Sequence, residues 1–83
     1  MKLNIKKAKE CGDMYGWGVY EEAGVVQITY SRTYPFDGNC LFNLMVTLKK
    51  ENPDMAMIIG PTFVDERGNV TTILNFEEKT SLI

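Results

Sequence analysis

The side chains best suited to nucleophilic chemistry in this 83-residue chain are two cysteines, Cys11 and Cys40. A thiol becomes a nucleophile when a nearby base or cation favours the thiolate, and the sequence contains no histidine to act as that base. Two widely separated cysteines also make neither a disulfide framework nor a cluster of metal ligands. We therefore interpret both as reduced, small hydrophobic residues.

Carboxylates and glycines offer two other kinds of chemistry, and neither pattern is specific here. Asp13, Glu21 and Asp65 lie in predicted turns, where solvated carboxylates are the usual finding. Gly16 and Gly18 lack the following helix and the Lys-Ser/Thr pair of a phosphate loop, so they indicate a strand with one bare face. The sequence predicts no enzymatic activity, no cofactor and no metal site.

Aromatic side chains are the best functional signal in the sequence. Six of the nine fall between the second predicted strand and the predicted helix: Tyr15, Trp17, Tyr20, Tyr30, Tyr34 and Phe36. Most are expected in the core, but one sheet face under one helix does not need them all. The surplus, Tyr20, Tyr34 and Tyr15, is predicted to line a protein interface. A base-stacking surface is not predicted, because Glu21 and Glu22 lie at the same hairpin tip.

These side chains are positioned by one predicted helix, Asn39–Glu51, which has apolar residues at helical spacing. Its core stripe contains Leu41, Leu44, Met45 and Leu48. Phe42 and Val46 form a second apolar strip, which one sheet cannot easily cover together with the first. We predict that this second strip forms the interface of a two-fold homodimer. Cover by the segment Tyr34–Phe36 or by Leu82 and Ile83 is the alternative.

The rest of the chain has the alternation and turn residues of an antiparallel sheet. The predicted strands are Lys2–Lys7, Met14–Tyr20, Val25–Ser31, Met55–Val64 and Val70–Phe76. Turns are expected at Gly12 and Asp13, at 21–24 and at 65–68. The apolar run Met55–Ile59 predicts a central strand buried on both faces, with a bulge at Gly60 and Pro61 before the strand continues.

The predicted fold is one α+β domain over residues 1–83, in the order β-β-β-α-β-β, with the helix packed on one face of the sheet. The strand order cannot be derived from the sequence. The predicted core is Leu3, Ile5, Trp17, Val19, Val26, Ile28, Leu41, Leu44, Met45, Leu48, Met57, Ile59, Val70, Leu74 and Phe76.

Charge and composition exclude several classes of partner. The formal net charge is −2, and this acidic balance predicts neither nucleic-acid nor membrane binding. Lys2, Lys6, Lys7 and Lys9 are interpreted as the protected edge of the first strand rather than a phosphate-binding arm. Neither a membrane span nor a signal peptide is recognisable, so a cytoplasmic location is expected.

The function class that remains is a non-catalytic, protein-binding or regulatory domain of the adaptor or inhibitor type, which associates with itself or with another protein. A small-molecule pocket beside the Gly16 and Gly18 face is the alternative. A third hypothesis is an acidic decoy for a nucleic-acid-binding protein, based on Glu21, Glu22 and the Asp65 turn.

Overall fold

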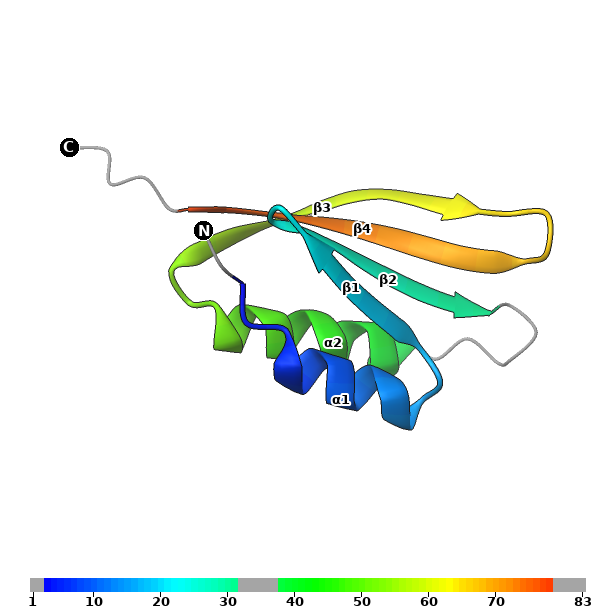
Figure 1. The fold of residues 1–83 in the computed structure, drawn as a ribbon, viewed down its shortest axis with the longest axis horizontal. Coiled ribbons are helices and arrows are strands. Elements are labelled where there is room, and N and C mark those ends of the chain that lie inside the picture. The colour runs from blue at the N-terminus through cyan, green and yellow to red at the C-terminus, as the bar shows by residue number, and fades with distance from the viewer. Residues whose placement is uncertain (1–2, 32–37, 79–83) are drawn as a thin grey trace.

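The computed structural model describes residues 3–31 and 38–78 and shows one antiparallel sheet with two helices (Figure 1). The elements are α1 (Lys6–Met14), β1 (Gly18–Glu22), β2 (Val25–Ser31), α2 (Gly38–Glu51), β3 (Met55–Val64) and β4 (Asn69–Glu78). The predicted α+β class and antiparallel sheet are confirmed. The prediction of about five strands and one helix is wrong, because the described residues form four strands and two helices.

The strands lie in the order β1-β2-β4-β3, and each neighbouring pair is antiparallel. Because β2 and β3 are both antiparallel to β4, they run parallel to each other with β4 inserted between them. Parallel strands need a crossover connection, and α2 lies in that connection. This split β-α-β arrangement leaves β1 and β3 as the two edges of the sheet.

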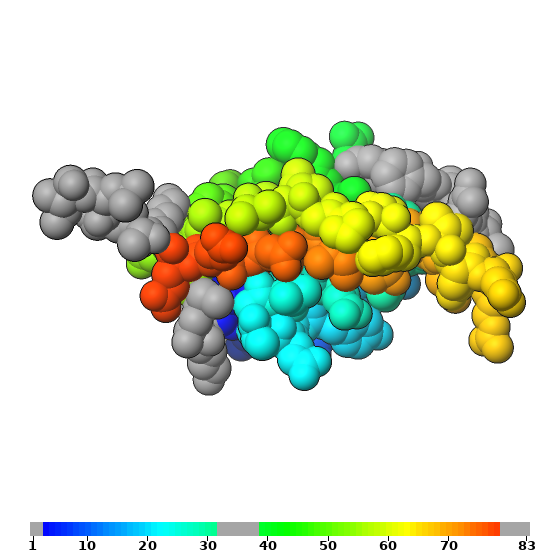
Figure 2. Space-filling view, turned by 90° about the horizontal axis from the view of Figure 1, so that it is seen from above, coloured from blue at the N-terminus to red at the C-terminus, as the bar shows by residue number. Residues whose placement is uncertain are grey.

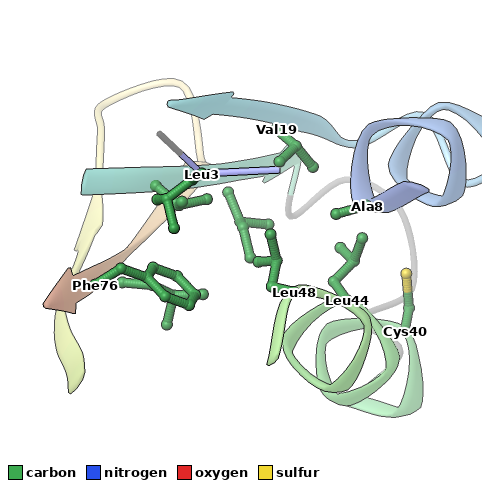
Figure 3. Packing of buried hydrophobic residues seen from close by; sticks show 10 residues of the cluster. Leu3, Ala8, Val19, Cys40, Leu44, Leu48 and Phe76 are labelled. Atoms are coloured by element: carbon green, nitrogen blue, oxygen red, sulfur yellow. The ribbon is translucent and has the colours of Figure 1, made fainter. Parts of the chain in front are cut away.

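Both helices cover the same face of the sheet, and the core lies between them and the strands (Figure 1). The buried cluster is Leu3, Ala8, Val19, Val26, Ile28, Cys40, Leu44, Leu48, Leu74 and Phe76. Figure 3 shows Leu44 and Leu48 pointing from α2 towards the sheet, with Ala8 of α1 beside Leu44. The predicted core side chains Ile5, Trp17, Leu41, Met45 and Met57 pack around this cluster and are partly buried.

The first helix replaces a predicted strand and a predicted turn. The alternation in Lys2–Lys7 suggested an edge strand, but the chain is helical from Lys6 through Gly12 and Asp13 to Met14. The face of α1 that is buried carries only Ala8 and Gly12, so it lacks the large apolar residues that reveal a helix in sequence. Lys6, Lys7 and Lys9 are exposed on α1, and the interpretation of these residues as a strand edge is wrong.

A glycine ends α1 and delays the start of the next strand. Gly16 has a φ of +73°, Trp17 N–H donates to the Gly12 carbonyl at 2.7 Å, and Gly16 N–H donates to the Asp13 carbonyl at 3.2 Å. This pair of bonds is a Schellman motif, in which a left-handed residue satisfies the last carbonyls of a helix. The predicted strand Met14–Tyr20 is therefore wrong over its first half, and β1 begins at Gly18.

Three of the other local predictions are confirmed. Residues Val25–Ser31 form β2, and the two-residue turn before it has positive φ at Ala23 and Gly24, as a type I′ hairpin turn requires. The helix α2 matches the predicted segment to within one residue. The predicted last strand is found within β4, which extends to Glu78. The predicted connection Arg32–Asp37 lies outside the described residues.

The prediction that Met55–Ile59 forms a central strand is wrong, because β3 lies at the edge of the sheet. The predicted bulge is present: Ile59 pairs with Leu74 and Thr62 with Thr72, so Gly60 and Pro61 together oppose Ile73. Ile59, which was expected in the core, is exposed on the helix-facing side, because it lies on an edge strand that runs towards the β3–β4 turn, and this end of the sheet projects past both helices (Figure 1).

Candidate functional site: the outer edge of β3

The edge strand β3 carries the main group of exposed apolar side chains in the described residues. Ile58 is 47% exposed, Ile59 62%, Phe63 57% and Val64 52%. Paired residues in an antiparallel sheet share a face, so Ile59 and Val64 lie on the helix-facing side and Ile58 and Phe63 on the outer side. The strand is therefore apolar and accessible on both faces.

Figure 2 shows how β3 lies relative to the other elements. In that view β3, in yellow-green, lies beside β4, in orange, while β1 and β2, in cyan, lie on the opposite side of β4. The end of the β3–β4 hairpin also projects past both helices (Figure 1). On the helix-facing side α2, in green, is visible past β3 in Figure 2, and Lys49 near its end donates to the Met55 carbonyl. The helix α2 therefore lies behind the first part of this strand, while Ile59 and Val64, further along, remain exposed.

The hydrogen-bonding pattern identifies which backbone groups face outward. At the hairpin end, Asp65 N–H donates to the Asn69 carbonyl at 2.9 Å, so Asp65 is bonded towards β4. Residues alternate between the two sides of a strand, and the bulge shifts this alternation by one position. The N–H and C=O groups that point away from β4 therefore belong to Met55, Met57, Ile59, Thr62 and Val64. Those of Met55 are already bonded to Asn52 and Lys49, which leaves the other four positions.

The bulge does not remove a donor from the outer edge. Gly60 packs so closely on β4 that an added Cβ would lie 3.1 Å from the Ile73 carbonyl oxygen. Because Gly60 and Pro61 together face Ile73, the N–H that proline lacks is lost from the β4 side of the strand. The four outward N–H groups are thus available to a partner strand.

The sequence of β3 contains none of the charged side chains that usually protect a sheet edge. Its ten residues include no lysine, arginine, aspartate or glutamate. Natural edge strands commonly carry such charges, because charged side chains prevent an accessible edge from pairing with other chains. A ten-residue, charge-free edge has the features of a binding surface.

The residues predicted to form an interface do not gather in one place. Phe42 on α2 is 64% exposed and Val46 is half-buried, while Tyr20 lies on β1 and Tyr15 follows α1, both exposed. Tyr34 lies outside the described residues. Tyr20 belongs to the opposite edge of the sheet from β3, so these side chains cannot all contact one small partner surface.

A shallow polar depression of about 460 Å³ lies near the residues predicted to form a small-molecule pocket. Its lining comprises Gly16, Gly18, Tyr20, Thr29, Tyr30, Ser31, Asp65, Asn69 and Thr71. A Cβ added at Gly18 would lie 2.7 Å from both the Tyr20 ring and Thr29 Oγ1, so these side chains pack over the glycine and would have to move. The glycine predicted to leave a bare face is thus covered by a tyrosine two residues later.

The titration of Asp65 is altered by the hydrogen bonds of the β3–β4 turn. The backbone N–H of Asn69 donates to Oδ1 at 2.9 Å and is the main reason that the pKa of Asp65 lies below its ordinary value. The side-chain amide of Asn69 and the backbone N–H of Arg67 act in the same direction. Through these bonds the Asp65 side chain stabilises the β3–β4 turn.

The other candidates for chemistry are dispersed. Cys40 is buried in the core and Cys11 is half-buried on α1. Within residues 3–31 and 38–78, no three side chains of His, Cys, Asp or Glu come together in a way that could hold a metal ion. None of the described helices is long and apolar enough to span a membrane.

No family model, no curated protein and no solved structure matches this chain.

A buried asparagine joins the N-terminal segment to the end of α2, and sequence reasoning missed it. Asn52 Oδ1 accepts from the Asn4 N–H at 2.8 Å, while Nδ2 donates to the carbonyls of Asn4 at 2.9 Å and Leu48 at 2.8 Å. In the sequence Asn52 precedes Pro53 and resembles an ordinary turn residue. Only the fold shows that it positions Leu3 over the core.

Proposed function

We propose that this chain is a non-catalytic protein-binding domain that binds its partner by adding a strand to the outer edge of β3. The observation that supports this most directly is the combination of four outward backbone positions with four exposed apolar side chains on one charge-free strand. In strand addition, main-chain hydrogen bonds supply affinity and alternate side chains supply specificity. The edge of β3 offers both.

Photocrosslinking tests this proposal. A photoreactive phenylalanine analogue is placed at Ile59, or at Tyr20 as the control, in cells that naturally make the protein. Both positions are exposed and both lie on edge strands, so the comparison reports which edge of the sheet is bound. We expect a crosslinked protein at position 59 that is weak or missing at position 20. Equal crosslinking at the two positions would refute binding at β3.

The depression between Gly18 and Asp65 favours a second candidate function, the binding of a small polar molecule. Its hydroxyl groups and the exposed Tyr20 ring suit a polyhydroxylated ligand. A thermal-shift screen with neutral sugars and nucleosides tests this, because a ligand of the native state raises the melting temperature with the logarithm of its concentration. The Thr29→Val variant should abolish such a shift. A shift that survives this substitution places the ligand elsewhere.

A further inference from the structure

We infer that the partner of β3 is a second copy of this chain, joined by antiparallel β3–β3 pairing into one continuous eight-stranded sheet. This inference rests on the proposed function, and it names the occupant of that edge. A two-fold axis perpendicular to the sheet places any edge strand antiparallel to its own copy. Such a dimer uses the same edge of both copies, so the chain needs no second binding surface.

The bulge selects one register for this pairing. Before the bulge the outward backbone groups belong to Met57 and Ile59, and after it they belong to Thr62 and Val64. With the two-fold axis at Gly60 and Pro61, Ile59 lies opposite Thr62 of the second copy and Met57 lies opposite its Val64. All four outward positions then pair at once. Shifting the register by one residue in either direction would place outward groups opposite inward ones.

The side chains agree with this register on both faces. On the outer face, Ile58 lies opposite Phe63 of the second copy, and this pair occurs twice because of the symmetry. Aliphatic and aromatic residues directly opposite each other are favourable cross-strand pairs. On the helix-facing side Met57 and Val64 form the equivalent pair. Each exposed apolar side chain of β3 therefore gains an apolar or threonine neighbour.

The absence of charge in β3 favours a second copy over a different partner. A charged residue close to a two-fold axis faces its own copy, so a self-pairing strand must avoid charge near that axis. A strand that recognises a different protein gains specificity from charge complementarity, and β3 has no charge to offer.

The area available is enough for a weak dimer. At roughly 200 Å² for a fully exposed large side chain, the exposures of the four apolar residues leave about 400 Å² per chain. The standard protein interface buries about 800 Å² per partner, and the strand backbone with Met57 and Thr62 supplies part of the difference. An interface of this size belongs to the small, transient class, so we expect association in the micromolar range or weaker.

Sedimentation equilibrium of the wild type, Ile59→Lys and Tyr20→Lys tests the inference. Each substitution replaces an exposed side chain of an edge strand by lysine, but only Ile59→Lys places a charge in the proposed interface, opposite Thr62 of the second copy and roughly 10 Å along the strands from its own copy. We expect a dimeric wild type, a dimeric Tyr20→Lys and at least about tenfold weaker association of Ile59→Lys. Circular dichroism confirms folding, and Val64→Lys replaces Ile59→Lys if that variant unfolds.

Three results overturn the inference. The first is a wild type that remains monomeric at millimolar concentration. The second is a Tyr20→Lys variant that dissociates as readily as Ile59→Lys. The third is a Phe42→Asp substitution that dissociates the dimer while Ile59→Lys does not. The last result would assign the interface to α2 instead. The photocrosslink separates this inference from the proposed function: a different protein joined at position 59 supports strand addition and overturns the homodimer. A lack of any crosslink at position 59 overturns both.

Disulfide trapping tests the register itself. Directly opposed residues in a non-hydrogen-bonded pair have Cα atoms about 4.5 Å apart, which permits a disulfide. In a Cys11→Ser background, Ile58→Cys and Phe63→Cys are purified separately and then mixed under mild oxidation. The mixture should form the covalent dimer, and neither protein alone should, because identical positions lie roughly 15 Å apart along the paired strands. Equal yields from one variant alone would overturn this register.

Discussion

Replacing Asn52 by alanine removes three hydrogen bonds at one step. Its side chain is buried and bonds to both backbone groups of Asn4 and to the Leu48 carbonyl. At roughly 0.5–1.5 kcal/mol for each bond, the loss amounts to about 2–4 kcal/mol of the free energy of unfolding. For a domain of this size that corresponds to a decrease in melting temperature of about 10–25 °C.

Urea unfolding followed by far-UV circular dichroism measures this loss, with Asn43→Ala on the exposed face of α2 as the matched control. The control should remain within about 0.5 kcal/mol of the wild type. Asn52→Asp should be at least as unstable as Asn52→Ala at neutral pH, because a carboxylate would face the carbonyl oxygens of Asn4 and Leu48. An Asn52→Ala protein as stable as the control would refute the role of Asn52 as the link between the N-terminal segment and α2.

Four further predictions concern single residues. Gly12→Ala should cost about 1–3 kcal/mol in urea unfolding, because its Cβ would lie 3.0 Å from both the Trp17 carbonyl oxygen and Cγ2 of Val19; an unchanged midpoint would contradict this packing. A Cβ added at Gly16 would meet no neighbouring atom, but the φ of +73° at this position is strained for alanine. Gly16→Ala should therefore lower the free energy of unfolding by about 1–2 kcal/mol, and Gly16→Asn should lower it less. The depressed pKa of Asp65 stabilises the β3–β4 turn above the unfolded pKa of about 3.9, and this contribution is lost as the pH falls through the folded value. NMR should show that the Asn69 amide loses protection, relative to its intrinsic exchange rate at each pH, over that acid range, and Asp65→Asn should abolish this dependence. Phe42→Asp should remain folded within about 0.5 kcal/mol, since this side chain is mostly exposed, and its unfolding would place Phe42 in the core.

Elements with large apolar side chains at regular spacing could be predicted from the sequence, and α1 could not. The segments that became α2, β2 and β4 each carry such side chains. The buried face of α1 is made from Ala8 and Gly12, whose small size lets the helix approach β1 closely. Small residues add little hydrophobicity, so a helix that packs closely through them shows almost no periodic pattern of apolar residues in its sequence.

The error at β3 has a different origin. A continuous apolar run indicates burial on both faces, but the sequence does not contain the strand order that decides whether burial occurs. Insertion of β4 between β2 and β3 moved that run to the edge. The same residues that suggested a central strand therefore became the candidate site. The exposure of Phe42, Tyr15 and Tyr20 agrees with their prediction as surface aromatics, and their role in an interface stays a prediction.

The sole tryptophan of the chain lies where it can report on one part of the fold. Trp17 stacks on Tyr30 with ring centroids 4.3 Å apart and an interplanar angle of 19°. Its backbone also closes the end of α1 through Gly12. Its fluorescence emission therefore reports whether α1 and β1 remain joined to β2. If emission and far-UV ellipticity change together on heating, the two ends of the sheet unfold as one cooperative unit; if emission changes first, the N-terminal part separates from a sheet that is still folded.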